Sequence, residues 1–192
     1  ITNFLSQNGA VPAIQLGHAG RKASMQRPWF GNGPLNSADF ERGDMAWPIV
    51  GPSAVPVGDG WLEPEAMSEA QINTLIDDFI AAARRSIIAG YKIIELHGAH
   101  GYLIHSFLSP LSNQRNDKYG GDLAGRMRLA IDVSGAVRRA IPDHMPLFFR
   151  ISAVDNIEGG WQLEDTLSLA GELAKLGVDV LDCSSSGIAG AA

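Results

Sequence analysis

Four short, mainly apolar runs divide the chain, at residues 11–16, 91–96, 146–151 and 178–182. Each is bounded by glycine, proline or polar residues. Strands buried on both faces of a parallel sheet have such short apolar runs, whereas half-exposed strands alternate apolar with polar residues. The pattern therefore predicts four strands of one parallel sheet.

Apolar residues at helical spacing fill the segments between the later runs. Ser68 and Gln71 form a capping-box sequence, and apolar positions at helical spacing follow as far as Gly90. The same spacing returns over residues 127–141 and 163–176. These segments predict three helices, each lying between two predicted strands.

Strands and helices thus alternate after a short helical tail at residues 1–8. Alternation of this kind favours right-handed parallel βαβ units, found in doubly wound sheets and in (β/α)8 barrels. A complete barrel takes eight such units and about 250 residues. We therefore expect an α/β fold that is a partial TIM (β/α)8 barrel of about four strands, a single domain over residues 1–192.

Four parallel strands leave two bare edges and one uncovered sheet face. We therefore expect the chain to be part of a longer chain or to associate with another copy, as in a homo-oligomer. The stretch from residue 18 to residue 67 holds six prolines and shows no sustained period. It predicts a long loop without regular structure after the first strand, and such loops often serve as lids or binding loops.

Composition and charge limit the kinds of molecule that the chain could bind. The chain of 192 residues is 45% hydrophobic and carries a formal net charge of -6, which disfavours nucleic acid or an anionic membrane as the main partner. No apolar run approaches the about 18 residues of a membrane helix. The single cysteine, Cys183, has no metal-site or disulfide spacing around it, which suggests a reducing compartment, with the cytoplasm as the default. We expect Cys183 to be a buried structural thiol.

Polar residues gather where the first predicted strand ends. Gln15, His18, Arg21 and Lys22 lie at or just beyond the end of the first strand, and active sites of parallel α/β folds form at that end. An amide such as that of Gln15 can donate and accept hydrogen bonds, which suits the edge of a heterocycle. A lone glutamine at such a position is, however, usually a structural anchor of the loop.

The second strand ends in E-L-H-G-A-H-G-Y, residues 95–102. Residues two apart share a face of a strand, so Glu95 and His97 should point the same way. With His100 and Tyr102, two imidazoles and a phenol could donate hydrogen bonds and a proton to one small substrate. The alternative is that one histidine binds backbone carbonyls and that the tyrosine packs the mouth of the site.

Metal binding is a further alternative, because His97, His100 and His105 could together hold zinc or a similar ion. No H-E-x-x-H pattern accompanies them, and we expect no metal. The third strand contains Arg150 among apolar residues, where a guanidinium needs an anionic partner or a ligand. We expect Glu95 to be that partner.

The polar loop at residues 107–121 contains Asn113, Arg115, Asp117 and Tyr119. A loop with so many internal donors and acceptors usually fixes its own shape, so we expect a structural role. Neither a dinucleotide-binding G-x-G-x-x-G, nor a Walker loop, nor G-x-S-x-G is present.

Three motifs follow one another along the chain: Q-L-G-H-A-G-R-K at residues 15–22, the long run E-L-H-G-A-H-G-Y-L-I-H-S-F-L-S-P-L-S-N-Q-R-N-D-K-Y-G-G at 95–121, and F-F-R-I-S at 148–152. In this order and spacing they resemble the old yellow enzyme family of flavin-dependent ene reductases. The run G-R-K-A-S-x-x-R-P-W at residues 20–29 is most similar to the bacterial branch of xenobiotic reductases and thermophilic-like members. The resemblance covers the whole chain and implies the third to sixth strands of an FMN-binding TIM barrel.

The resemblance also implies roles for single residues. Gln15 would bind the pyrimidine edge of the flavin, and Arg150 would lie near flavin N1 and O2, where negative charge accumulates on reduction. His97 and His100 would donate to the carbonyl or nitro oxygen of an activated alkene, and Tyr102 would protonate the carbon beside it. FMN would be the cofactor and NAD(P)H the reductant. Gly98 departs from the larger residue that relatives often carry there, which should alter packing and not the donors.

Two other functions remain open at this point. One is a metal-dependent hydrolase that uses His97, His100 and His105. The other is an inactive half-barrel fragment that binds nothing.

Overall fold

A computed structural model describes residues 1–189, and its centre is a four-stranded parallel sheet. The strands are β1 (Ala13–Leu16), β4 (Ile93–Gly98), β5 (Leu147–Ser152) and β6 (Val180–Ser184), in the spatial order β1-β4-β5-β6. All four predicted strands are confirmed, with their ends shifted by a few residues. Neighbours in the sheet are thus consecutive along the alternating pattern, as in a segment of a (β/α)8 barrel.

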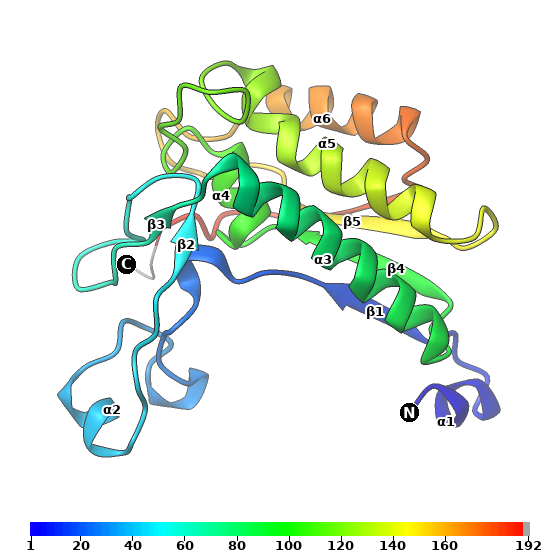
Figure 1. Ribbon diagram of the computed structural model, residues 1–192, viewed down its shortest axis with the longest axis horizontal. Helices are drawn as coiled ribbons and strands as arrows, with labels where there is room; N and C mark the ends of the chain where they lie inside the picture. Colours follow the sequence, from blue (N-terminus) through cyan, green and yellow to red (C-terminus); the bar gives the residue numbers. More distant parts are fainter. Residues whose placement is uncertain (190–192) are drawn as a thin grey trace.

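Three long helices cover one face of this sheet (Figure 1). They are α3 (Glu69–Ile88), α5 (Leu123–Ala140) and α6 (Leu163–Lys175), and they follow β1, β4 and β5 respectively. The predicted capping box opens α3, because the Ser68 hydroxyl accepts from the Gln71 amide while the Gln71 side chain accepts from the Ser68 amide. The helical tail is also confirmed, as α1 (Thr2–Gln7). No helix within residues 1–189 is long and apolar enough to cross a membrane.

The core lies between the sheet and these helices. Ile94 and Leu96 of β4 and Leu147, Phe149 and Ile151 of β5 point toward the helices and are fully buried. The opposite face of the same strands carries Glu95, His97 and Arg150 beside the apolar Ile93 and Phe148, and it is only partly covered within residues 1–189. Because side chains alternate along a strand, this burial fixes which residues face the open side.

The long loop predicted after the first strand is present, but the expectation that residues 18–67 lack regular structure was wrong. The segment contains the 3-10 turns Gly20–Lys22 and Pro28–Phe30, the helix α2 (Ser37–Glu41), and two short paired strands, β2 (Val50–Gly51) and β3 (Glu65–Ala66). Asn36 and Asp39 form a capping box that holds α2 without any apolar periodicity. Figure 1 shows α2 on an arm that extends away from the sheet. These elements are too short for a periodic signal in the sequence.

A further helix, α4 (Leu103–Leu108), also escaped the sequence prediction. It begins directly after the turn that ends β4, and all six of its residues are buried. A short helix that is buried on every side, polar His105 and Ser106 included, shows no amphipathic period. Its burial nevertheless anchors the turn that carries the candidate site.

Gly98, at the end of β4, is close-packed against the next strand. A Cβ at this position would overlap the ring of Phe149 and come within 3.0 Å of the Arg150 carbonyl oxygen. Phe149 thus fills the space that a larger residue would need, which accounts for glycine here.

Gly98→Ala should therefore destabilise the protein by about 1–3 kcal/mol through overpacking. Combining it with Phe149→Leu should recover part of that loss, because the smaller side chain leaves room for the added methyl group. Urea unfolding of both single variants and the double variant measures the coupling. Strict additivity would contradict this account of Gly98.

Candidate active site

The candidate site lies on the open face of the sheet, toward the carboxyl ends of the strands. In the parallel register Gln15 is opposite Glu95, and His97 is opposite Arg150, which is opposite Asp182. Residues opposite each other in a parallel sheet point to the same face. The sheet therefore places one amide, one imidazole, one guanidinium and two carboxylates on a single surface.

His97, His100 and Tyr102 come together at the end of β4. The ring centroids of His97 and His100 are 5.2 Å apart, and those of His97 and Tyr102 are 4.9 Å apart, both edge to face. The chain turns back sharply between them, with His100 in the left-handed region at a φ of 59°. This turn brings three polar rings from six consecutive positions onto one spot, as the sequence predicts.

His97 is held as a neutral imidazole with its Nε2 available. The Ala99 amide donates to Nδ1 at 3.3 Å, so the ring proton of the neutral form lies on Nε2. Burial, the neighbouring His100 and the Arg150 guanidinium lower the pKa of His97 to about 4. Within residues 1–189 no hydrogen bond involves Nε2, so this donor is available to a ligand.

His100 is held both at its backbone amide and at its ring. Its amide donates to the Ser152 hydroxyl at 2.9 Å, and its Nε2 lies 2.7 Å from Ser184 Oγ. Burial and the nearby Arg150 charge lower the pKa of His100 as well. Both imidazoles are therefore neutral near pH 7, and in this structure Ser184 occupies Nε2 of His100.

The predicted pairing of Glu95 with Arg150 is wrong. Glu95 Oε2 accepts from Gln15 Nε2 at 2.6 Å, and Arg150 Nη1 pairs with Asp182 Oδ2 at 3.1 Å. The register explains this, because Glu95 lies opposite Phe148 on β5, whereas Asp182 lies directly opposite Arg150. Arg150 Nε is nevertheless buried without a hydrogen-bond partner among the described residues.

The structure separates His105 from the other two histidines. Its Nδ1 accepts from the Gly101 amide at 2.8 Å and its Nε2 contacts Asp155 Oδ1 at 2.8 Å, both in the interior. With both nitrogens engaged, His105 cannot complete a metal site with His97 and His100. Across residues 1–189, no three His, Cys, Asp or Glu side chains are arranged to hold a metal ion.

Several contacts to the site escaped the sequence analysis. Asp182 and Ser184, two apart on β6, reach Arg150 and His100, and Lys22 Nζ donates to the His100 carbonyl at 2.9 Å. The sequence did contain a signal for two of these residues, because Asp182 and Ser184 lie two apart at the end of a predicted strand and therefore share a face. Burial and the adjacent Arg21 lower the pKa of Lys22 to about 8.

Two other predictions are now decided. Cys183 is a free, exposed cysteine and not a buried one, because β6 lies at an edge of the described sheet.

The loop at 107–121 does fix its own shape, since Asn113 Nδ2 donates to the Phe107 and Tyr119 carbonyls and Arg115 pairs with Asp117.

Comparison with known proteins agrees with the motifs. The model of the NADH:flavin oxidoreductase / NADH oxidase family matches residues 1–192. The chain belongs to this family.

Two curated relatives and one solved structure give the extent of the match. NADH:flavin oxidoreductase FG08077 of Gibberella zeae is 41% identical over 98% of this chain and 48% of its own length. An NADPH dehydrogenase of Halalkalibacterium halodurans is 42% identical over 94% of this chain and 47% of its own. The old yellow enzyme homologue from Zymomonas mobilis is 28% identical with a TM-score of 0.76, over 95% of this chain and 50% of that one.

Family membership confirms the resemblance to old yellow enzymes and the α/β architecture with a parallel sheet. The chain spans about half the length of the curated relatives. The activity and the substrates of the whole protein are therefore proposals.

The protonation of His97 should make stability depend on pH. Its pKa is 6.5 in the unfolded chain and about 4 in the fold, so the unfolded state binds more protons between these values. The contribution of the neutral His97 to the free energy of unfolding is therefore fully present above pH 6.5, and it is lost as the pH falls through 4. His97→Asn should flatten this dependence by up to about one proton.

Urea unfolding of the complete protein at a series of pH values measures that slope. The exposed His144 is a matched control, and His144→Asn should leave the slope unchanged. A slope equally steep in His97→Asn and in the native protein would contradict the low pKa of His97.

Proposed function

We propose that the protein carrying this chain is an FMN-dependent NAD(P)H oxidoreductase of the old yellow enzyme type that reduces activated alkenes such as enones and nitro compounds. The observation that carries the proposal is the cluster of His97, His100 and Tyr102 beside Arg150 on the open face of the sheet. It presents hydrogen-bond donors, a phenol and a permanent cation to the same space. The names of the relatives, NADPH dehydrogenase and NADH:flavin oxidoreductase, support the reaction class.

The residues present fit a flavin. Arg150 has a buried Nε without a partner, and Gln15 presents an amide on the same open face, two strands away. A guanidinium near a flavin pyrimidine would stabilise negative charge there, and an amide would satisfy its donors and acceptors. When bound, FMN would supply hydride that it first receives from NAD(P)H.

The imidazoles would bind and polarise the substrate. His97 Nε2–H donates to the carbonyl or nitro oxygen of the alkene, and His100 donates to the same oxygen once that oxygen replaces Ser184 Oγ. Neutral donors suit this task, because they stabilise the negative charge that develops on the oxygen without holding a competing anion.

Tyr102 would complete the reaction. The Tyr102 hydroxyl would give its proton to the carbon beside the activating group, once the remote carbon has received the hydride that bound FMN would supply. Water returns a proton to the phenol. The balance is one alkene, one NAD(P)H and one proton giving one saturated product and NAD(P)+.

We also propose that β1, β4, β5 and β6 are the third to sixth strands of an eight-stranded barrel. A groove at each edge of the sheet supports this assignment. The groove beside β1 is lined by Ile14, Leu16 and Ala82. The groove beside β6 is lined by Leu173, Val180 and Leu181. Further strands and helices would cover such apolar edges. Association with another copy and a cytoplasmic location remain proposals, the latter on the single cysteine.

A visible absorption spectrum of the complete protein tests the function. A bound flavin spectrum, bleached by NADPH and restored by an enone, is expected. Tyr102→Phe should slow restoration by the enone about 100-fold or more, the usual contribution of a general acid, while leaving bleaching by NADPH unchanged. A protein without flavin that contains stoichiometric zinc on elemental analysis would favour the metal-dependent alternative.

The two histidines are tested by binding of 4-hydroxybenzaldehyde, a phenol whose oxygen would take the place of the substrate oxygen. His97→Ala and His100→Ala should each weaken binding about tenfold, the effect of losing a hydrogen bond to a charged oxygen. Affinities unchanged in both variants of a flavin-loaded protein would refute their role.

Ser184 should act as a competitor of the ligand. Because its hydroxyl occupies His100 Nε2, Ser184→Ala should tighten 4-hydroxybenzaldehyde binding about two- to tenfold, the worth of one ordinary hydrogen bond. Ser168→Ala, on the exposed face of α6, is the matched control and should have no effect. Weaker binding in Ser184→Ala would instead make Ser184 a positioning residue.

A further inference from the structure

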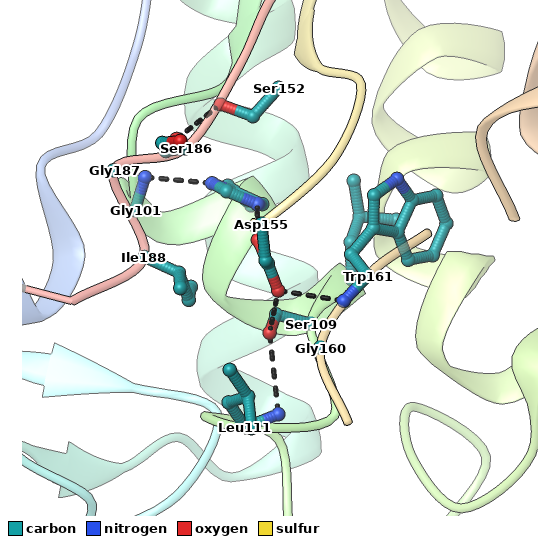
Figure 2. A network of polar contacts seen from close by, with 12 residues as sticks. Gly101, Ser109, Leu111, Ser152, Asp155, Gly160, Trp161, Ser186, Gly187 and Ile188 are labelled. Atoms are coloured by element: carbon teal, nitrogen blue, oxygen red, sulfur yellow. Dashed lines mark hydrogen bonds and ion pairs between the residues drawn. The ribbon is translucent and has the colours of Figure 1, made fainter. Parts of the chain in front are cut away.

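A buried chain of hydrogen bonds reaches Gly101, the residue between His100 and Tyr102, from Asp155 and its neighbours (Figure 2). The side chains of His105 on α4 and Asp155, after β5, are fully inaccessible and lie 2.8 Å apart. At its other nitrogen, His105 accepts from the Gly101 amide. These hydrogen bonds therefore connect the buried carboxylate of Asp155 to the backbone of the site at Gly101.

Asp155 is supplied with donors on both oxygens. Oδ1 faces His105, while Oδ2 accepts from the Ser109 hydroxyl at 2.6 Å and from the Trp161 amide at 2.7 Å. Burial raises the pKa of Asp155, but these hydrogen bonds and the adjacent His105 outweigh it, so its pKa lies below the usual value. Asp155 is thus a carboxylate that can only accept.

This carboxylate fixes the tautomer of His105. A peptide amide can only donate, so Nδ1 of His105 must be unprotonated where it meets Gly101. The ring proton then lies on Nε2 and points at Asp155. One imidazole in one tautomer satisfies both neighbours, and the opposite tautomer satisfies neither.

The peptide that His105 holds belongs to an unusual stretch of backbone. His100 and Gly101 both lie in the left-handed region, with φ of 59° and 72°. This conformation is unfavourable for a residue with a side chain and persists only where neighbouring contacts enforce it. Such contacts reach His100 at its amide from Ser152 and at its carbonyl from Lys22.

We propose that His105, oriented by Asp155, is a positioning residue for the His100–Tyr102 turn, and that it sets the ligand affinity of the site through the Gly101 amide. The inference rests on the proposed function for the identity of the ligand. It differs from a general stabilising role, because only the Nδ1 contact of His105 bears on the ligand. The Nε2 contact serves to choose the tautomer.

Two isosteric variants separate these contacts. In His105→Asn, Oδ1 takes the place of Nδ1 and still accepts from Gly101, but the contact with Asp155 is lost. In His105→Gln, the longer amide still reaches Asp155, but the acceptor for Gly101 is lost. The exposed His144→Asn is the matched control.

Binding of 4-hydroxybenzaldehyde to the complete, FMN-loaded protein is the main readout. His105→Gln should weaken it about tenfold, since it leaves a buried donor unpaired, and His105→Asn should stay within about threefold of the native protein. In a His100→Ala background, His105→Gln should cost less than about twofold, because the residue through which it acts is gone. Equal losses in the two variants, or an undiminished loss in the His100→Ala background, would overturn the proposal.

A second measurement separates this inference from the proposed function. Nitrogen-15 spectra of the histidine rings in the native protein should show His105 protonated at Nε2 alone, and a ring protonated at Nδ1 would refute the proposal. If the native protein binds neither FMN nor the phenol, the proposed function fails. The amide resonances of His100 and Tyr102 then decide the positioning role, which requires that they shift in His105→Gln and not in His105→Asn.

Discussion

The alternation of side chains along β4 is the constraint on which the site depends. Ile94 and Leu96 must enter the core beneath the helices, and this requirement turns Glu95 and His97 to the open face. A slip of one residue would bury a carboxylate and an imidazole and expose two aliphatic chains. The hydrophobic packing on one face thus determines the polar surface on the other, and the parallel register carries the same division to β1, β5 and β6.

Beyond the end of β4 the polypeptide is held by hydrogen bonds in place of sheet pairing. The backbone of the turn through His100 and Gly101 is held from three sides, by Lys22 after β1, Ser152 at the end of β5 and His105 of α4. These contacts fix the turn before any ligand arrives, while burial and the Arg150 charge lower the pKa values of His97 and His100 and keep both imidazoles neutral. Under the proposed function, such preorganised neutral donors would stabilise a developing negative charge.

Charges on the open face are paired across strands and not with the partners that the sequence suggested. Arg150 contacts Asp182 while its Nε is buried without a partner among residues 1–189, and Glu95 accepts from Gln15. Pairing between neighbouring strands depends on register, and register is a property of the whole sheet. The same reasoning applies to Cys183, whose exposure follows from the edge position of β6 and not from its apolar neighbours.

The sequence by itself determined the four strands, the three covering helices, the capping of α3 and the gathering of His97, His100 and Tyr102, because each is a local pattern within a single element or turn. It missed α2, α4 and the short strands β2 and β3, which are too short or too uniformly buried to show a period. Only the tertiary structure decided that His105 turns inward to Asp155 while His100 turns toward Ser184. Those partners lie 50 and 84 residues away along the chain, and which pairs form is set by how strands and loops meet in space.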